Sequence, residues 1–214
     1  MFLDLPSRYP EYLITTILII LAPGPSVLFT IARAISWGRA AAVATVAGNV
    51  TGAFVVSLIV AFGLGPILQR SAITFTTVQI LGGLYLIYLG IDAIRHSAIH
   101  ASEMINVVKD RPSPLKSMRD GFWVGALNPK VLVFFAAILP QFVDKDGAAP
   151  ITQQLIAMGA TFSILAFIGD STWGLLAGTL RNQIARSPKK LVLMRRVGGI
   201  VMIGLGLFTL STAL

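Results

Sequence analysis

Cysteine is absent from the 214-residue chain, histidine occurs only twice, and charged residues make up only 12% of the total. The lack of cysteine excludes disulfides, thiolate metal sites, iron–sulfur clusters and cysteine nucleophiles. No histidine lies in an apolar stretch where it could activate a serine, and no glycine-rich nucleotide-binding loop occurs. We therefore expect no enzyme, no cofactor, no metal site and no use of ATP by this chain.

Apolar residues dominate what is present. They make up 55% of the chain, and the mean hydropathy is +0.80. A helix that crosses a bilayer needs ~20 apolar residues, and runs of this length recur along the whole sequence. The sequence predicts an all-α integral membrane protein with six transmembrane helices, at about residues 11–31, 41–64, 73–94, 121–143, 152–176 and 197–213.

Basic residues are distributed unequally between the predicted loops. Most of the 17 Lys and Arg residues fall after the first, third and fifth helices, whereas the opposite side holds only Arg8, Arg70 and Lys145. Cytoplasmic loops of membrane proteins are enriched in Lys and Arg. We therefore predict that both termini lie outside the cytoplasm. The net charge of +8 reflects this topology, and no nucleic acid is expected as a partner.

The two halves of the chain share a sequence pattern. Residues 81–90 align without gaps to residues 197–206, with three glycines and one leucine in register. Glycine also recurs in membrane helices simply as a small packing residue, which is the alternative explanation. The match predicts two three-helix repeats, 1–94 and 121–214, joined by a cytoplasmic linker at 95–120. An odd number of helices per repeat would make the repeats inverted, as in many secondary transporters.

Prolines interrupt the first and fourth predicted helices. The first break contains Pro23, Gly24 and Pro25, and the second contains Asn128 and Pro129. Such breaks free backbone groups inside the membrane, and a following half-helix offers N–H groups to a carboxylate. A simple structural kink is the alternative at each proline. Paired breaks at matching positions favour a substrate-binding role for these five residues.

Few polar side chains lie inside the predicted helices. Lys130 is a candidate for binding a substrate carboxylate, and Asp170 for carrying a proton; Asn49 is a further polar candidate. The alternatives are a structural salt bridge for Asp170, a Lys130 side chain that reaches the cytoplasmic surface, and a helix-to-helix hydrogen bond for Asn49. Asp92 is interpreted as interfacial. His96 and His100 would suit a metal only if their segment were helical, and a solvated loop is the simpler interpretation.

Several of these motifs, in this order, resemble the lysine exporter and homoserine/threonine exporter family (LysE/RhtB). They are Pro23-Gly24-Pro25, Gly82-Gly83 with the run from Tyr85 to Gly90, and Phe122 to Lys130 leading to Phe134-Phe135 and Pro140-Gln141-Phe142-Val143. The resemblance covers nearly the whole chain. It implies a bacterial inner-membrane exporter of amino acids or their derivatives, driven by the proton motive force. It implies no particular amino acid, because the segment Ala47-Gly48-Asn49 departs from relatives that are less polar there.

The function expected from sequence is therefore secondary active export of an amino acid by proton antiport. The expected partners are the small substrate and the lipid bilayer, and the sequence leaves a homo-oligomer open. Two other classes also stay open, a small-solute channel and a membrane subunit without transport of its own. A channel would show flux that saturates poorly and lacks counterflow, and a non-transporting subunit would move nothing in vesicles.

Overall fold

The computed structural model of the chain describes residues 6–70, 72–97, 112–179 and 188–213. In these segments every regular element is a helix. The elements are α1 (Tyr9–Leu21), α2 (Pro25–Trp37), α3 (Arg39–Arg70), α4 (Ala72–Arg95), α6 (Pro114–Ala126), α7 (Pro129–Val133), the π-helix η1 (Phe134–Ile138), the 3₁₀-helix η2 (Leu139–Phe142), α8 (Ile151–Thr179) and α10 (Pro188–Ala213). His100 and most of the predicted linker lie outside the described residues.

The described helices supply four candidate membrane spans, or six if each bent pair is counted as one span. Within α3, α4, α8 and α10 a stretch is long and apolar enough to cross a membrane, and two bent pairs reach the same criterion together. The bent pairs are α1 with α2 and α6 with the segment 129–142, and each is bent by 47°. The all-α prediction is therefore confirmed, the six predicted spans are compatible with this count, and both predicted breaks are bends.

Two helices begin well before their predicted starts. Helix α10 begins at Pro188 rather than near residue 197, and the fourth span begins at Pro114 rather than near residue 121. Ser113 caps the helix, because its hydroxyl accepts a hydrogen bond from the Lys116 amide at 3.2 Å, and Pro114 occupies the first turn. A serine cap followed by proline starts a helix as readily as proline ends one. The signal interpreted as a linker therefore belongs partly to α6.

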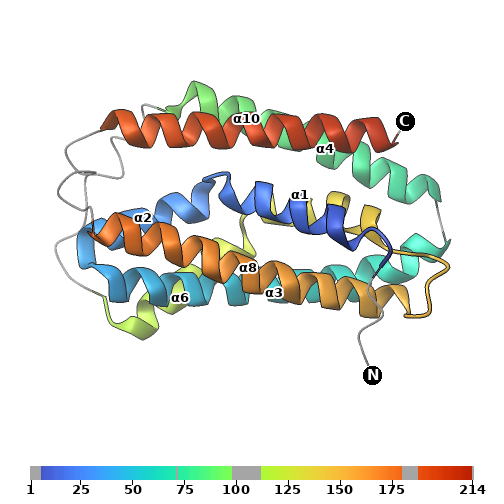
Figure 1. Cartoon of the computed structure of the whole chain (residues 1–214), viewed down its shortest axis with the longest axis horizontal. Helices are drawn as coiled ribbons and strands as arrows, with labels where there is room; N and C mark the ends of the chain where they lie inside the picture. Colours follow the sequence, from blue (N-terminus) through green and yellow to red (C-terminus); the bar gives the residue numbers. More distant parts are fainter. Residues whose placement is uncertain (1–5, 71, 98–111, 180–187, 214) are drawn as a thin grey trace.

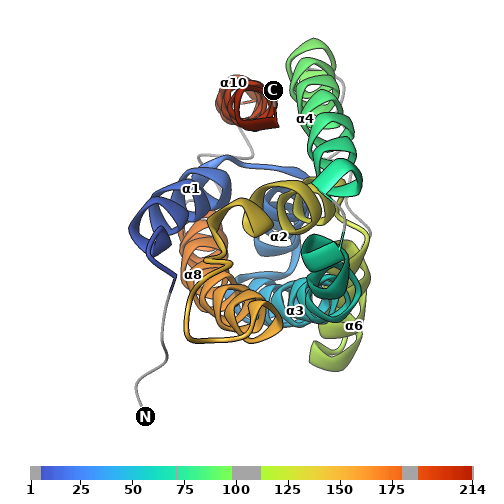
Figure 2. The same cartoon turned by 90° about the vertical axis from the view of Figure 1, so that its right-hand side faces the viewer.

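Two groups of helices are visible when the molecule is viewed along its length. Figure 2 shows α4 and α10 side by side, next to a larger group formed by α1, α2, α3, α6 and α8. Figure 1 shows that most helices run roughly along the long axis of the molecule. The broken segments 22–24 and 127–128 therefore lie inside the larger group or at its border with α4 and α10.

Glycines bring α4 and α10 into close contact. A methyl group at Gly90 would lie 2.5 Å from the Gly199 carbonyl oxygen, and one at Gly206 would lie 2.6 Å from the Gly83 carbonyl oxygen. Each of these glycines therefore allows one backbone to approach the other, as small residues do in membrane helix pairs. Because Gly83 meets Gly206 while Gly90 meets Gly199, the two helices are antiparallel.

A second glycine contact joins α3 to α6 with the helices parallel. Gly48 and Gly52 of α3 face backbone atoms of Met118 and Phe122, while Gly121 and Gly125 of α6 face the carbonyls of Thr45 and Asn49. Any side chain at these four glycines would collide with the neighbouring backbone. The close contact fixes α6, and with it the second break, against the middle of α3.

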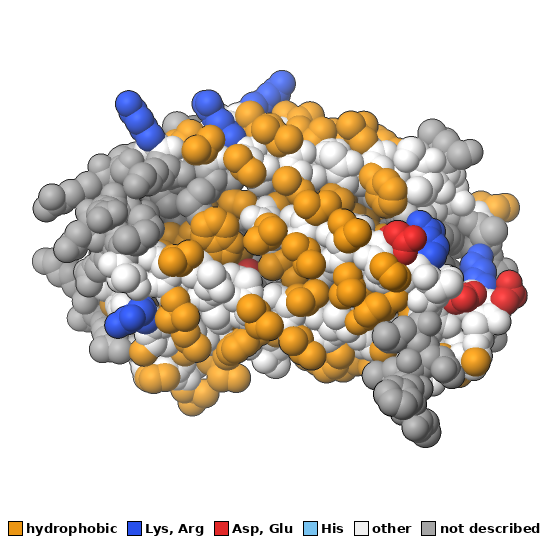
Figure 3. Space-filling model, viewed as in Figure 1, with side chains coloured by type: hydrophobic (Ala, Val, Ile, Leu, Met, Phe, Trp, Pro, Cys, Tyr) orange, Lys and Arg blue, Asp and Glu red, His pale blue; other side chains and the backbone are white. Residues whose placement is uncertain are grey.

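Aromatic and apolar side chains fill the larger group and also cover its outside. Inside, a continuous cluster of buried rings forms, with tilted or edge-to-face contacts between Tyr12, Phe134, Phe135, Phe142 and Phe162. Outside, large apolar side chains are exposed on several helices, and Figure 3 shows hydrophobic side chains spread over the broad middle of one face. An apolar exterior of this extent is what a lipid-facing surface requires.

Candidate functional site

The first break interrupts a span between α1 and α2. The helical hydrogen bonds of α1 end with Ala22, whose amide donates to the Leu18 carbonyl at 3.1 Å. Gly24 is extended, and α2 begins at Pro25, which has no N–H to leave unpaired. Carbonyl groups at the end of α1 therefore lack partners within their own helix, as at every helix C-terminus.

Asn128 organises the second break. Its side-chain oxygen accepts a hydrogen bond from the Lys130 amide at 3.1 Å, which caps α7. Its amide nitrogen donates to the Ser26 hydroxyl at 3.0 Å, and both residues are buried. The Asn128–Ser26 bond joins the first turn of α2 to the start of α7. The two breaks therefore meet in space.

Lys130 carries its charge into the first break. Its side chain is only 4% exposed, and its Nζ donates to the carbonyls of Ile19 at 2.9 Å and Ala22 at 2.8 Å. A cation at the C-terminal end of a helix is stabilised by the helix dipole. Lys130, which comes from the fourth span, therefore caps the C-terminal end of α1. Gly24 makes room for it, because a methyl group there would lie 3.1 Å from Nζ. The side chain does not reach the surface.

Asp170, on α8, lines a cavity that Lys130 also lines. It is 5% exposed and accepts a hydrogen bond from the Asn49 amide nitrogen of α3 at 3.0 Å. The Asn49 side-chain oxygen is buried and has no hydrogen-bond partner in the described part of the chain. Asp170 forms no ion pair there either, so the structure does not show the salt bridge considered from sequence. The Asn49 contact is the helix-to-helix hydrogen bond that the sequence had left open.

Two small cavities meet at Lys130. The first, which we call the Asp170 cavity, measures about 20 Å³ and is lined by Lys130, Asp170, Asn49 and Ser26 together with apolar residues. Lys130 and Asp170 therefore line the same space, and no ion pair joins them in the described part of the chain.

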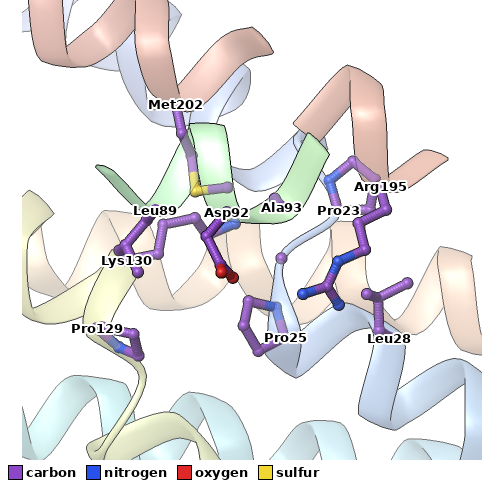
Figure 4. A pocket seen from close by; sticks show the side chains of 11 residues that line it. Pro23, Pro25, Leu28, Leu89, Asp92, Ala93, Pro129, Lys130, Arg195 and Met202 are labelled. Carbon is purple, nitrogen blue, oxygen red and sulfur yellow. The ribbon is translucent and has the colours of Figure 1, made fainter. Parts of the chain in front are cut away.

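The second cavity, which we call the break cavity, measures about 40 Å³ and lies on the side of α4 and α10. Pro23, Gly24, Pro25, Pro129 and Lys130 line it from the breaks, and Figure 4 shows Asp92 and Arg195 beside Pro25. Cavities of this size hold one or a few waters, which is less than an amino acid occupies. Neither cavity, as it stands, has room for a molecule of that size.

Hydrogen bonds join the first and fourth spans on either side of the breaks. At one end Arg33 of α2 donates to the Asp120 carboxylate of α6 at 3.0 Å, and its guanidinium lies over Trp37 at 4.3 Å from the ring centre. At the other end Arg8 donates to the Gln141 carbonyl at 3.0 Å. Tyr12, beneath it, donates its hydroxyl to the Met158 carbonyl of α8.

Most of the sequence-predicted site residues line one of the two cavities. Pro23, Gly24, Pro25 and Pro129 line the break cavity, Asn49 and Asp170 line the Asp170 cavity, and Lys130 lines both. Asn128 reaches the site through Ser26.

Sequence reasoning missed Ser26, Arg195 and the place of Asp92 in the break cavity. Ser26 follows Pro25 in the first turn of a half-helix, where its hydroxyl was a usable signal. Arg195 and Asp92 lie at the ends of their apolar segments, and the sequence does not indicate which helices pack against them.

Comparison with known proteins gives a consistent result over nearly the whole chain. The family model described as LysE type translocator matches residues 17–212. The uncharacterized membrane protein YrhP of Bacillus subtilis is 27% identical over 207 residues, covering 92% of this chain and 96% of that protein. A homoserine/homoserine lactone efflux protein of Salmonella typhi is 30% identical over 195 residues, covering 91% of this chain and 92% of that protein.

A further homoserine/homoserine lactone efflux protein, from Salmonella typhimurium, is 29% identical over 195 residues, with 91% of this chain and 92% of that protein covered. No solved structure matches the chain. The family model spans both breaks, Lys130 and Asp170, so the match includes the site as well as the apolar helices. The chain belongs to the LysE type translocator family.

Proposed function

We propose that this protein is a secondary active exporter of amino acids or small amino-acid derivatives, located in the bacterial inner membrane and driven by proton antiport. Its family consists of transporters, so the chain is a membrane transporter and not an enzyme. The observation that carries the proposal further is the pair Lys130 and Asp170, two buried opposite charges that face one cavity without touching each other.

The chemistry of this pair fits a zwitterion. Lysine has three N–H donors at Nζ, and two of them are used by the carbonyls of Ile19 and Ala22. The third N–H can donate a hydrogen bond to a substrate carboxylate. The Asp170 carboxylate and the unpartnered oxygen of Asn49 are acceptors for an ammonium group. Buried charges are costly in a membrane protein unless they are paired or hydrated, and an amino acid would pair both at once.

Proton coupling follows from competition for one carboxylate. Asp170 accepts either a proton or the ammonium group of the substrate, but binding one disfavours the other. A substrate that arrives from the cytoplasm displaces the proton, and a proton that arrives from outside displaces the substrate. Net export then uses the inward proton gradient. The amides of Gly24 and of the residues after Pro25 in the first turn of α2 would add N–H donors for the carboxylate once the site opens.

The inverted repeat is part of the proposal, because alternating access is commonly a movement of one repeat against the other. The alignment of residues 81–90 with 197–206 equates Gly83 with Gly199 and Gly90 with Gly206. A two-fold axis between α4 and α10 therefore turns the Gly83–Gly206 contact into the Gly199–Gly90 contact, and both contacts occur. The equal bends of 47° in the two broken spans support the same relation.

A transport assay with purified protein in vesicles tests the proposal. We would load vesicles with homoserine, because two relatives carry homoserine efflux in their names, and impose a pH gradient of either sign. Proton antiport predicts concentrative movement of substrate against the proton flow, saturation, and counterflow when substrate is loaded on the far side. A panel of other amino acids in the same assay identifies the substrate.

Three outcomes would contradict the proposal in different ways. Flux without saturation or counterflow would indicate a channel. Substrate exchange that does not depend on the pH gradient would exclude proton coupling, but the assignment as a transporter would stand. No movement of any amino acid by a monodisperse protein would leave the six-helix membrane fold but would overturn the amino-acid assignment.

A further inference from the structure

We infer that the break cavity is a second binding site for the amino-acid substrate, in which Asp92 of α4 binds the substrate ammonium group. This inference rests on the proposed function, because it names a further contact of the same substrate. The Asp170 cavity already offers one place for an ammonium group. The break cavity offers a second, on the other side of Lys130 and nearer to the ends of α4 and α10.

The charges that line the break cavity match an amino acid. Asp92 supplies a carboxylate, while Lys130 and Arg195 supply an ammonium and a guanidinium group. Figure 4 shows Asp92 and Arg195 converging on Pro25 from two different helices. A zwitterion bound here would place its ammonium group at Asp92 and its carboxylate at the cations. The surrounding prolines, with Leu28, Leu89 and Met202, give the site apolar walls.

Asp92 keeps capacity for a ligand. His96 lies one turn further along α4, and its Nδ1 is 2.8 Å from Asp92 Oδ1. That contact involves one carboxylate oxygen, and a carboxylate can accept several hydrogen bonds. The side chain of Asp92 is 37% exposed, so a substrate can reach it without unfolding the helix. The contact with His96 therefore leaves the other carboxylate oxygen of Asp92 as an acceptor for a ligand.

Close backbone packing holds this cavity together. A methyl group at Gly198 of α10 would lie 2.5 Å from the Pro23 carbonyl oxygen, so α10 rests directly on the first break. Arg195 precedes Gly198 by one turn and is carried to the same place. The pair α4 and α10 thus does more than face lipid, because it completes a polar site at the break.

Lys130 is common to both cavities, and this suggests the order of events. The break cavity lies toward the helix ends that the charge distribution predicts to be cytoplasmic, so substrate would meet Asp92 first. Its carboxylate would stay near Lys130 while its ammonium group moves from Asp92 to Asp170. Asp92 then determines capture of the substrate, and Asp170 determines coupling to the proton.

The test compares Asp92→Asn with the wild type in the vesicle assay, using initial rates over a range of substrate concentrations. Loss of a charged hydrogen bond to the ammonium group should raise KM at least about tenfold. The maximal rate should stay within about threefold, because Asp170 and Lys130 are intact. His96→Gln is the matched control, since it removes the partner of Asp92 but keeps the carboxylate, and its KM should stay near that of the wild type.

A second readout is specific to the ammonium group. The wild type should discriminate against the 2-hydroxy acid in which a hydroxyl group replaces the amino group of the substrate. Asp92→Asn should lower this discrimination by about tenfold. Ala93→Leu supports the test if Asp92→Asn fails to fold. It fills the break cavity without changing any charge, and it should also raise KM.

The outcomes separate this inference from the proposed function. If the wild type transports amino acids but Asp92→Asn and Ala93→Leu keep its KM and its discrimination, the second site is overturned and the proposed function stands. If KM rises equally in His96→Gln, the effect belongs to the end of α4 and the inference fails. If the wild type moves no amino acid, both conclusions fall together.

Discussion

Lys130 Nζ donates a hydrogen bond of 2.8 Å to the carbonyl oxygen of Ala22, which joins the second break of the chain to the end of the helix before the first break. The two residues are far apart in sequence, and each satisfies a hydrogen-bonding group of the other. Ala22 ends a helix inside the membrane and needs a donor, while Lys130 is a buried cation and needs acceptors. Any substrate that binds Lys130 therefore acts on both breaks at once.

Replacing Lys130 with Met should reduce stability as well as transport. Met keeps most of the side-chain volume but leaves the Ile19 and Ala22 carbonyls without this donor, at a cost of about 1–3 kcal/mol for each unpaired buried group. We expect a lower midpoint of thermal unfolding in detergent and no concentrative transport. Lys130→Arg is the comparison, because it keeps the charge but changes its shape. A Met variant as stable as the wild type would show that water replaces the lysine.

Asp170→Asn should abolish proton-coupled transport while the protein still inserts into the membrane. Asparagine is similar in size and can still accept a hydrogen bond from Asn49, but its side chain cannot take up and release a proton as a carboxylate does. We expect substrate movement in vesicles to become independent of the pH gradient. Asp144→Asn is the matched control, since Asp144 lies outside both cavities in the loop before α8. Coupling at the wild-type level in Asp170→Asn would remove this carboxylate from the mechanism.

Gly90→Ala should weaken the contact between α4 and α10. The added methyl group would lie 2.5 Å from the Gly199 carbonyl oxygen, so the helices must separate, and a cost of about 1–3 kcal/mol is expected for overpacking of this kind. Gly204→Ala is the control on α10, because nothing lies within 4 Å of a methyl group there. Thermal unfolding of the two variants measures the difference. Equal midpoints would mean that this helix contact is loose in the membrane.

Much of the fold could be predicted because the membrane restricts the choices. Backbone groups in lipid must be satisfied within helices, so apolar length alone identifies the spans. The positions of the prolines then identified both breaks. Pro25 and Pro129 cannot continue a helix from the preceding turn but can begin a new one. The π-helix and 3₁₀-helix at 134–142 were not foreseen. They surround Pro140, which removes a helical donor, and the Gln141 side chain donates to the Ala137 carbonyl at 2.7 Å.

The candidate site was predictable only as a set of residue types. Lys130 and Asp170 were recognisable because charges inside apolar helices are rare. Their partners were not, because Ile19, Ala22 and Asn49 reach them through packing of spans that are distant in sequence. Asp92 shows the same limit. It was interpreted as interfacial from its place near the end of a helix, and only the position of α10 over the first break shows that it lines a cavity.

The Arg33–Asp120 pair should control access to the site from its own end of the molecule. It joins α2 to α6 at 3.0 Å, and the two side chains are 15% and 26% exposed, so it is worth about 1 kcal/mol after allowance for solvent. Asp120→Asn should therefore favour opening at this end by roughly fivefold. The absence of native cysteine makes this measurable, because Ala53→Cys places a single thiol on the wall of the Asp170 cavity.

In that background the rate of modification by a membrane-impermeant thiol reagent reports opening, and inverted vesicles allow each side to be tested separately. We expect Asp120→Asn to speed modification from the side that carries Arg33 and to leave the rate from the other side unchanged or lower. Arg119→Gln is the control, since Arg119 is 70% exposed and its guanidinium lies 3.9 Å from the same carboxylate. Faster modification from both sides would indicate general loosening. An unchanged rate would mean that the pair is structural and that another contact closes this end.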